Sequence, residues 1–277
     1  MVSRIERLPD SLFVIEQNKK RPELNAQCWK FRCEIHGEFT AVVTMGRFDL
    51  VQCRECRDER MKTEAGNRLA DEFRKKLVQN HGVPADNAHA TFEDFRIRKE
   101  DGEQTAFGDS VALHAVEDLF DSLYASDPYS ALKIVAIYGD KGNGLSYLGA
   151  ALVSAAVKRS RSAYMIRSSE LVDLVQSSGK NRTDKAVALL MRQFTAYDVL
   201  VIDDLDPAVW SQASNPFFAD LILNRYSAMK PTLVLSHEIP MKVVAAFGPA
   251  VENRFKKGRT IVLKGSDRHK TTKEVTA

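Results

Sequence analysis

The sequence predicts an α/β fold with a parallel sheet, preceded by a small cysteine-containing module and a helix. Beyond Thr91, short β-branched apolar runs alternate with longer stretches of helical spacing. Such alternation indicates parallel strands joined by right-handed helical crossovers. All four cysteines fall within residues 28–57. We therefore expect a module over residues 1–60, a helix and linker over 61–89, and the α/β domain over 90–277.

Length and composition limit the class of protein. The chain has 277 residues, of which 44% are hydrophobic, as in ordinary globular proteins. Its net charge of +3 identifies no partner. The N-terminus lacks the apolar region of a signal peptide, and no apolar run approaches the ~18–20 residues that span a bilayer. We expect a cytoplasmic protein without a membrane partner, in which paired cysteines indicate metal rather than disulfides.

The cysteine segment contains two ligand pairs, Cys33-x2-His36 and Cys53-x2-Cys56, separated by sixteen residues. Two short-spaced pairs of this kind predict a zinc ribbon, since each pair can point both side chains at one ion. Two strands are expected between them, around Met45-Gly46-Arg47. Cys28 leaves an alternative open, because it could replace His36 as the fourth ligand or be a free thiol.

The elements expected next follow hydrophobic spacing. Leu69, Phe73 and Leu77 predict a helix over residues 64–79, ended by Gly82 and Pro84. Residues 1–27 show no clear periodicity. Five further strands are expected over residues 132–138, 163–167, 198–204, 232–236 and 259–263, the last of them at an edge of the sheet. The helices expected between them cover residues 146–159, 168–176, 183–194 and 215–229.

The stretch "IYGDKGNGLSY" joins the first of these strands to a helix. It has the frame of a phosphate-binding loop, G-x-x-x-x-G-K-[ST], except that Leu145 replaces the lysine. Glycines let the backbone N–H groups approach phosphates, and the following helix adds its N-terminal dipole. Candidate nucleotide-binding residues are Gly139, Asp140, Lys141, Gly142, Asn143, Gly144, Leu145, Ser146 and Tyr147.

A second motif, "VLVIDDLD", is an apolar strand that ends in two acids. Asp203 fits the acid that holds Mg²⁺, and Asp204 the position that orients an attacking water. Because parallel strands bind ligands beyond their carboxyl ends, both motifs can reach one crevice. We therefore expect ATP or ADP with Mg²⁺. Without the lysine, nucleotide binding weakens and transition-state charge loses a main stabiliser. Lys141 is either a solvated loop residue or a substitute cation, toward these phosphates or those of a neighbouring subunit.

Several stretches together resemble the AAA+ ATPase domain of bacterial and phage replicative helicase loaders (DnaC/DnaI type) and the related IstB-like transposition ATPases. They are "ATFEDFRI", "YGDKGNGLSYLGAAL", "VLVIDDLD", "LILNRYSAMKPTLVLSHEIP", "FGPAVENRF" and "GSDRHK". The resemblance covers roughly residues 90–270. It implies a hexameric replicative helicase bound through the N-terminal region, a spiral of like subunits, and contact with single-stranded DNA.

The resemblance also assigns roles. It places Ser236 and His237 on sensor 1, Arg254 on an arginine-finger segment and Arg268 on a sensor 2-like position. Departures accumulate: leucine for lysine, Asp204 for glutamate, His237 for asparagine and Ala250 for an arginine. Together they predict slow or absent hydrolysis on a retained assembly scaffold.

We therefore expect a helicase loader, with Lys256, Lys257 and Arg259 as candidate contacts to single-stranded DNA. Two alternatives stay open. One is an IstB-like transposition-accessory ATPase, and the other a non-catalytic helicase adaptor that has kept the fold without the activity.

Overall fold

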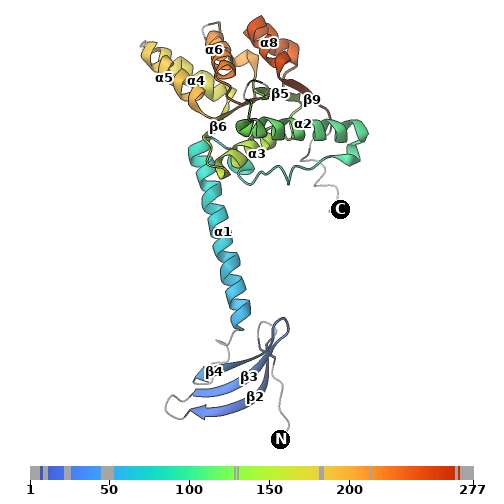
Figure 1. Ribbon diagram of the computed structural model, residues 1–277, viewed down its shortest axis with the longest axis vertical. Helices are drawn as coiled ribbons and strands as arrows, with labels where there is room; N and C mark the ends of the chain where they lie inside the picture. The colour runs from blue at the N-terminus through green and yellow to red at the C-terminus, as the bar shows by residue number, and fades with distance from the viewer. Residues whose placement is uncertain are drawn as a thin grey trace. The chain divides into compact units, whose positions relative to one another are not determined.

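The computed structural model describes residues 7–8, 12–21, 26–44, 53–127, 129, 131–180, 184–212, 214–265 and 268. The chain divides into two compact units, Met1–Glu72 and Phe73–Ala277, and each is described by itself (Figure 1).

The first unit contains a four-stranded antiparallel sheet in the order β1-β2-β3-β4. Its strands are β1 (Arg7–Leu8), β2 (Leu12–Arg21), β3 (Ala26–Cys33) and β4 (Gly37–Thr44). Strand β4 was expected. Strands β1 to β3 were not, because their polar sequences hide the pairing that holds β2 along β3. The second strand expected after Met45 lies outside the described residues.

Helix α1 (Arg54–His81) begins ten residues before the predicted start at Glu64. The sequence shows no apolar spacing over the first turns of this helix, and the side chains of residues 57–72 are exposed in the structure. The predicted stop is confirmed. Gly82 adopts a left-handed φ of +68°, and the N–H of Val83 donates to the carbonyl of Leu77 at 3.3 Å, which turns the chain away from the helix axis.

The second unit is built on a five-stranded parallel sheet in the order β6-β7-β8-β5-β9. The strands are β5 (Ile134–Gly139), β6 (Ala163–Arg167), β7 (Val199–Asp203), β8 (Thr232–Ser236) and β9 (Arg259–Leu263). The α/β fold predicted from the sequence is confirmed, including β9 as an edge strand. Because β8 alone separates β7 from β5, the ends of those two strands lie near each other at one edge of the sheet.

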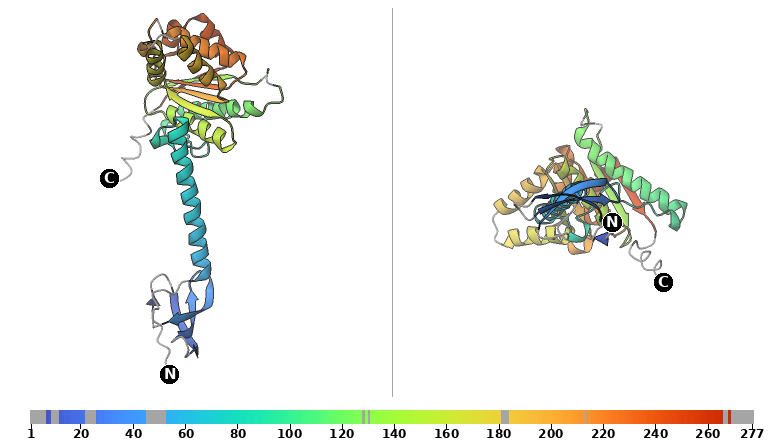
Figure 2. Two further views of the ribbon diagram at one scale, coloured as in Figure 1. Left: turned by 90° about the vertical axis from the view of Figure 1, so that its left-hand side faces the viewer. Right: turned by 90° about the horizontal axis from the view of Figure 1, so that it is seen from below.

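Helices cover both faces of this sheet (Figure 2, left view). They are α2 (Glu103–Asp121), α3 (Leu145–Lys158), α4 (Ser168–Lys180), α5 (Asp184–Ala196), α6 (Asn215–Ser227), α7 (Pro240–Phe247) and α8 (Pro249–Lys257). Alternate strand residues enter two hydrophobic clusters: Val135 and Ile137 pack with α2 and α3, whereas Ala136 and Tyr138 pack with the face that carries α4 to α8. Residues from all five strands thus hold a three-layer domain together.

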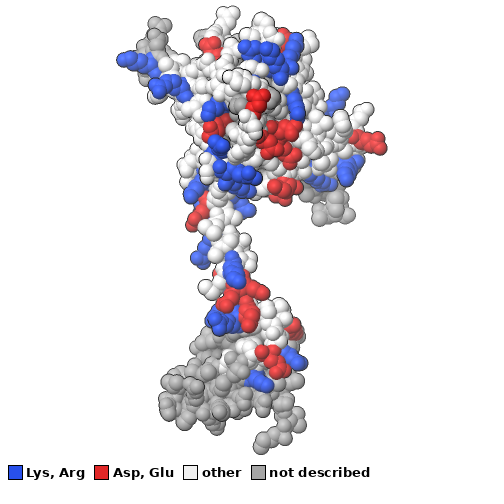
Figure 3. Space-filling view, viewed as in Figure 1, with Lys and Arg blue, Asp and Glu red and all other residues white. Residues whose placement is uncertain are grey.

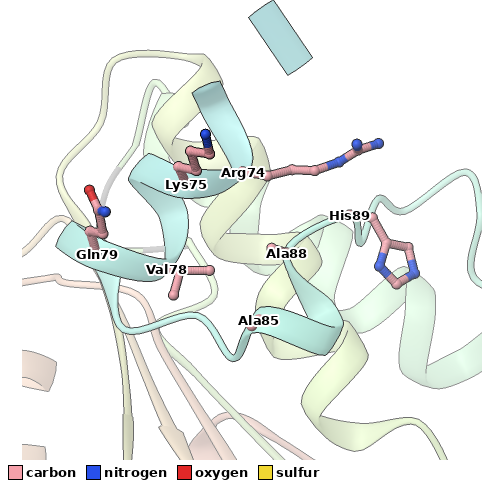
Figure 4. A pocket seen from close by; sticks show the side chains of 7 residues that line it. All are labelled: Arg74, Lys75, Val78, Gln79, Ala85, Ala88 and His89. Carbon is pink, nitrogen blue, oxygen red and sulfur yellow. The ribbon is translucent and has the colours of Figure 1, made fainter. Parts of the chain in front are cut away.

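The last turns of α1 belong to this second unit. Leu77 is fully buried in the cluster beneath α3, and His81 Nδ1 donates to the carbonyl of Ala163 at 2.9 Å. Beside these turns is a groove of about 400 Å³, lined by Arg74, Lys75, Val78, Gln79, Ala85, Ala88 and His89. Figure 4 shows Val78 facing Ala85, with the Lys75 amine turned away. The groove shares no lining residue with the glycine loop.

No described helix combines the length and the apolar character that crossing a bilayer requires.

Candidate functional site

The glycine loop follows β5 directly and leads into α3. Gly142 and Gly144 have φ of +85° and +81°, values that only glycine adopts without strain. The N–H of Asn143 donates to the carbonyl of Asp140 at 3.2 Å and closes a tight turn. The loop therefore delivers the chain to the N-terminus of a 14-residue helix, where backbone N–H groups favour an anion.

The acid pair and the glycine loop meet. Asp203 at the end of β7 is only 3% exposed, and the Ser146 side chain at the start of α3 lies near enough to lower the pKa of its carboxylate. Burial raises the pKa of Asp203, against the opposing effect of the Ser146 side chain. The two strand ends thus share one site, as the parallel topology predicts.

This site suits a divalent cation. Asp203 Oδ1 is buried and has no hydrogen-bond partner among the described residues. A buried carboxylate oxygen without a partner is costly, and beside a serine hydroxyl it supplies the hard oxygen ligands that Mg²⁺ prefers. The residues present fit the predicted Mg²⁺ of a bound nucleotide, with Ser146 and Asp203 as its ligands.

Asp204 and His237 lie together next to the buried acid. Asp204 adopts φ of +50° and leaves its side chain 54% exposed. His237 Nδ1 is 2.7 Å from the carbonyl of Gly139, so that nitrogen carries the proton. Its Nε2 then lies 4.0 Å from Asp204 Oδ1. Ser236 instead donates to the carbonyl of Leu205 at 2.5 Å and acts on the backbone after the acids.

The replacement at the lysine position points inward. Leu145 is 2% exposed and belongs to the hydrophobic cluster of the α2–α3 face. Asp140 and Lys141 are exposed on the loop. Tyr147 packs against His89 and Phe95, and its hydroxyl accepts from the N–H of Thr91 at 3.4 Å. Tyr147 therefore holds the segment from His89 to Phe95 against α3.

The two predicted arginines occupy different surroundings. Arg268 donates through Nε to the carbonyl of Asn143 at 2.9 Å, and its guanidinium lies 4.3 Å from the ring centre of Phe95. Arg254 lies over the ring of Tyr226 at 4.9 Å, away from the glycine loop in sequence and contacts. Of the candidate DNA contacts, Lys256 is paired with Glu252 at 2.5 Å and Arg259 with Asp118.

The cysteine segment forms a compact cluster in the first unit. One ligand atom from each of Cys33, His36, Cys53 and Cys56 lies within 4.8 Å of the others. Cys33 Sγ is 3.6 Å from Cys56 Sγ, close to the separation of about 3.8 Å that a tetrahedral Zn²⁺ with ~2.3 Å bonds to sulfur requires. His36 Nδ1 faces the sulfurs, while Nε2 lies 3.2 Å from Glu59 Oε1. A carboxylate behind a histidine ligand is the usual supporting contact at zinc sites.

Local structure explains this convergence. Cys33 ends β3 and His36 lies in the turn before β4, whereas Cys53 precedes α1 and Cys56 lies in its first turn. Cys28, in β3, pairs with Val42 of β4. It lies five residues before Cys33, which puts their Cα atoms about 16 Å apart at the ~3.3 Å rise per residue of a strand. The cluster present therefore contains His36, the alternative preferred by spacing.

The thiols of this cluster have different pKa values, and ionisation of one thiol opposes ionisation of the next. Burial opposes ionisation of Cys33, but hydrogen bonds from the backbone of His36 and Ile35 outweigh it and lower its pKa to about 7. Burial and the neighbouring Cys33 raise the pKa of Cys56 to about 11. Three thiolates cannot coexist here without a cation, so the donor set fits Zn²⁺.

The nucleotide-type site lies within a region that is similar to a known family. Residues 87–248, more than half of the chain, match the family described as "IstB-like ATP binding protein". The chain belongs to this family. The matched range includes the glycine loop and the acid pair, and it ends before Arg254 and Arg268.

Other proteins resemble the IstB-like domain more distantly. The chromosomal replication initiator DnaA of Bifidobacterium animalis subsp. lactis (strain AD011) is 25% identical over 185 residues, which cover 64% of this chain but only 29% of that protein. The crystal structure of the DnaC helicase loader superimposes with a TM-score of 0.52 at 16% identity, covering 65% of this chain and 99% of that one. The DnaI structure gives 0.51 at 18% identity, over 67% and 93%. These likenesses establish the AAA+ P-loop fold.

Sequence reasoning missed two residues of the IstB-like site. Arg98 and Asp109 are buried beside the glycine loop, where Arg98 donates to Asn143 Oδ1 at 2.7 Å. A charged pair in a segment without an assigned motif gave no signal, although an apolar spacing through Ala112, Val116 and Leu119 could have revealed helix α2.

Proposed function

We propose that this protein is a helicase loader in DNA replication, an AAA+ nucleotide-binding protein that delivers a hexameric replicative helicase to single-stranded DNA. Family membership supports nucleotide binding, and the fold is that of the DnaC and DnaI structures. The order of the motifs along the chain supports the same role.

The observation that carries the nucleotide site is that β5 and β7 flank β8 in parallel, which brings the glycine loop and Asp203 to one end of the sheet, where burial raises the pKa of Asp203 and the nearby Ser146 lowers it. This is the edge of the sheet where parallel α/β domains bind ligands. In the proposed mechanism the loop N–H groups and the α3 N-terminus bind the phosphates, and Ser146 and Asp203 hold the metal. Bound Mg²⁺ would neutralise charge on the phosphates.

The remaining polar residues act on the γ-phosphate side. Asp204 accepts a hydrogen bond from the attacking water, and its shorter side chain reaches about one methylene less far than glutamate. His237 donates a hydrogen bond from Nδ1 to the carbonyl of Gly139, and its Nε2 faces Asp204. Since Leu145 offers no cation, hydrolysis is slow, and nucleotide serves mainly as an assembly switch.

The N-terminal module, residues 1–60 as predicted from the sequence, binds the helicase. Zinc on Cys33, His36, Cys53 and Cys56 has no open ligand position and serves folding. This role separates the module from the chemistry of the α/β domain, which we assign to residues 90–277 with a helix and linker between them.

Single-stranded DNA is held by basic side chains near α8. Lys and Arg gather over α8 in Figure 3, and three of them lie in its last turn. Lys256 and Arg259 are partnered by surface acids, but exposed ion pairs of this kind are weak and can exchange for phosphates. Binding should therefore be tolerant of sequence and strongly dependent on salt.

Self-assembly would place one subunit's cations near the next subunit's nucleotide. Lys141 is exposed on the loop and available for that contact. Arg254, half-buried over Tyr226, needs to leave that ring before it can act as a finger in a neighbouring site.

The test is a loading assay with the replicative helicase of the same host and single strands coated with single-strand-binding protein. We expect a stable complex and transfer of helicase to the DNA. Cys53→Ser should abolish complex formation, whereas Cys28→Ser, outside the metal cluster, should preserve it. Failure of the unmodified protein to bind the helicase would falsify the loader role.

A second candidate is an accessory ATPase of transposition, favoured by the family to which the chain belongs. Such a protein would bind duplex DNA and a transposase in place of the helicase. Measuring binding to duplex and single-stranded DNA at matched salt separates the two, because a loader prefers the single strand.

A third candidate, the non-catalytic adaptor, is favoured by the buried Leu145. Calorimetric titration with ATP decides it, because an adaptor binds the helicase but gives no heat with nucleotide.

A further inference from the structure

Three charged side chains, those of Arg98, Asp109 and Arg268, form a cluster beside the glycine loop. Asp109 is fully buried in α2, and Arg98 is 2% exposed. Arg98 donates to both carboxylate oxygens of Asp109, through Nε at 2.9 Å and Nη2 at 2.7 Å. Arg268 Nη2 lies 3.0 Å from Asp109 Oδ1. One carboxylate therefore holds two arginines that are distant in sequence.

Both arginines also hold the loop itself. Arg98 Nη1 donates to Asn143 Oδ1 at 2.7 Å, which fixes the buried Asn143 side chain. Arg268 donates through Nε to the carbonyl of Asn143 at 2.9 Å and through its backbone N–H to the carbonyl of Gly142 at 3.0 Å. Two consecutive carbonyls of the loop are thus bonded to the same residue.

The packing of this contact is tight. A Cβ at Gly144 would lie 2.7 Å from Arg268 Nε, and a Cβ at Gly265 would lie 2.7 Å from Arg98 Nη1. A side chain at either position would push the arginine away from its present place beside the backbone. At Gly144 the left-handed φ also favours glycine.

The contact has a direct consequence for phosphate binding. In a planar trans peptide the carbonyl and the N–H point in opposite directions. Because the Asn143 carbonyl is held toward Arg268, the following N–H, that of Gly144, is directed away from Arg268 and free for a phosphate. A charge-assisted bond to the carbonyl also polarises that peptide and strengthens its N–H as a donor.

The arginine cluster does not favour phosphate binding through its net charge. Asp101 lies 4.0 Å from Arg98 Nη1, so Arg98 faces two carboxylates, those of Asp101 and Asp109. The cluster cannot supply the missing positive charge of a lysine at position 145. It supplies orientation instead.

We propose that Arg98, Asp109 and Arg268 are positioning residues that hold the glycine loop in its phosphate-binding arrangement before nucleotide arrives. This inference rests on the proposed nucleotide binding. It assigns Arg268 a structural contact to the loop in place of direct contact with a γ-phosphate. It also makes Arg268 part of the nucleotide site.

The test compares Arg268→Ala with Arg225→Lys in the full chain. Arg225 is another buried arginine that donates to backbone carbonyls, but it does so between α5, α6 and β8. Arg225→Lys therefore controls for general loss of stability. Hydrogen exchange of residues 140–146 without nucleotide, the Kd for ATP with Mg²⁺ and the Tm are measured for each variant.

Arg268→Ala should speed amide exchange in the loop and raise the Kd about ten- to a hundredfold, the usual effect of losing hydrogen bonds to a charged group. Arg225→Lys should lower the Tm while leaving both quantities unchanged. Unchanged loop exchange in Arg268→Ala overturns the inference, whatever the Kd does. If the unmodified protein binds no ATP, the proposed nucleotide function fails, and loop exchange still decides the positioning role.

Discussion

The two units of the chain are stabilised in different ways. In the described part of the first unit, the buried cluster consists of Cys33 and Cys53, with Phe39 and Cys56 packed against them. In the second unit, two clusters cover opposite faces of a five-stranded sheet. Small modules with little core usually need a metal or disulfides to fold. From this comparison we expect the first unit to depend on an ion and the second on apolar burial, so that each can be broken separately.

Metal removal should have the largest effect and should be confined to the first unit. Structural zinc contributes about 10–16 kcal/mol of apparent binding free energy to small domains, which is folding free energy there. Chelation, or Cys56→Ser, should unfold residues 26–56 and leave the Tm of the α/β domain unchanged. Metal analysis and hydrogen exchange check this, with Cys28→Ser as the control that keeps about one zinc per chain.

A substitution at Arg225 should break the second unit alone. This side chain is fully buried and donates to carbonyls of Phe194, Tyr197 and Pro231 and to the hydroxyl of Thr232. Burial lowers its pKa to about 9. Arg225→Ala leaves these acceptors unsatisfied and should cost about 3–5 kcal/mol of unfolding free energy.

Chemical denaturation measures that cost. Arg192→Ala, on the exposed side of α5, should change the stability by less than about 0.5 kcal/mol. A loss at Arg225 no larger than at Arg192 would contradict the assignment, and so would any loss of zinc.

Restoring a cation at position 145 sharpens the comparison within the second unit. Leu145→Lys should lower the Kd for ATP about ten- to a hundredfold, since hydrogen bonds to charged groups are worth about 1.5–3 kcal/mol. Leu145→Met keeps the buried volume without the charge and should leave the Kd unchanged. Calorimetry checks both variants. An equal Kd for all three proteins would mean that more than the lysine has been lost.

The smallest effect concerns pH. Burial raises the pKa of Asp203 above its ordinary value of 3.8, so the folded state binds this proton more tightly than the unfolded chain. A raised carboxyl pKa makes stability fall as pH rises above that ordinary value. Asp203→Asn should therefore raise the Tm at pH 7, with a gain that disappears toward pH 4.

A domain of this size shifts by about 2–4 °C for each kcal/mol, which calorimetry resolves. Asp204→Asn is the matched control, because its carboxylate is largely exposed and its removal should change the Tm little. A gain at Asp203 that persisted at pH 4 would show that burial of the charge is not its cause.

Much of the second unit could be predicted because its strands are short apolar runs bounded by glycine or acids. The same reasoning brought the glycine loop and Asp203 to one edge of the sheet. It missed β2, whose residues are mostly polar, and α8, whose charged residues mask its spacing. The arginine cluster was out of reach for another reason. Arg98, Asp109 and Arg268 meet only through the fold, and no local pattern links them.

The roles expected for Asp204, His237 and Arg254 stay predictions, and the sensor 2-like role of Arg268 is the one that the positioning inference would replace. Their positions depend on backbone turns after strands and on the C-terminal segment, where spacing in sequence gives no direction for a side chain. Position 145 shows the limit plainly. The substitution was visible in the sequence, whereas its burial depends on how α3 packs against α2.

The position of β5 in the sheet affects how the domain folds while the chain is being synthesised. This strand, Ile134–Gly139, pairs on one side with Thr232–Ser236 and on the other with Arg259–Leu263, and both partners are synthesised much later. In the nascent chain β5 therefore stays unpaired on both sides until Thr232–Ser236 emerges, and on one side until Arg259–Leu263 emerges. Pairings this distant are slow to form and leave unpaired backbone open to aggregation. Truncation before residue 263 would make that interim state permanent.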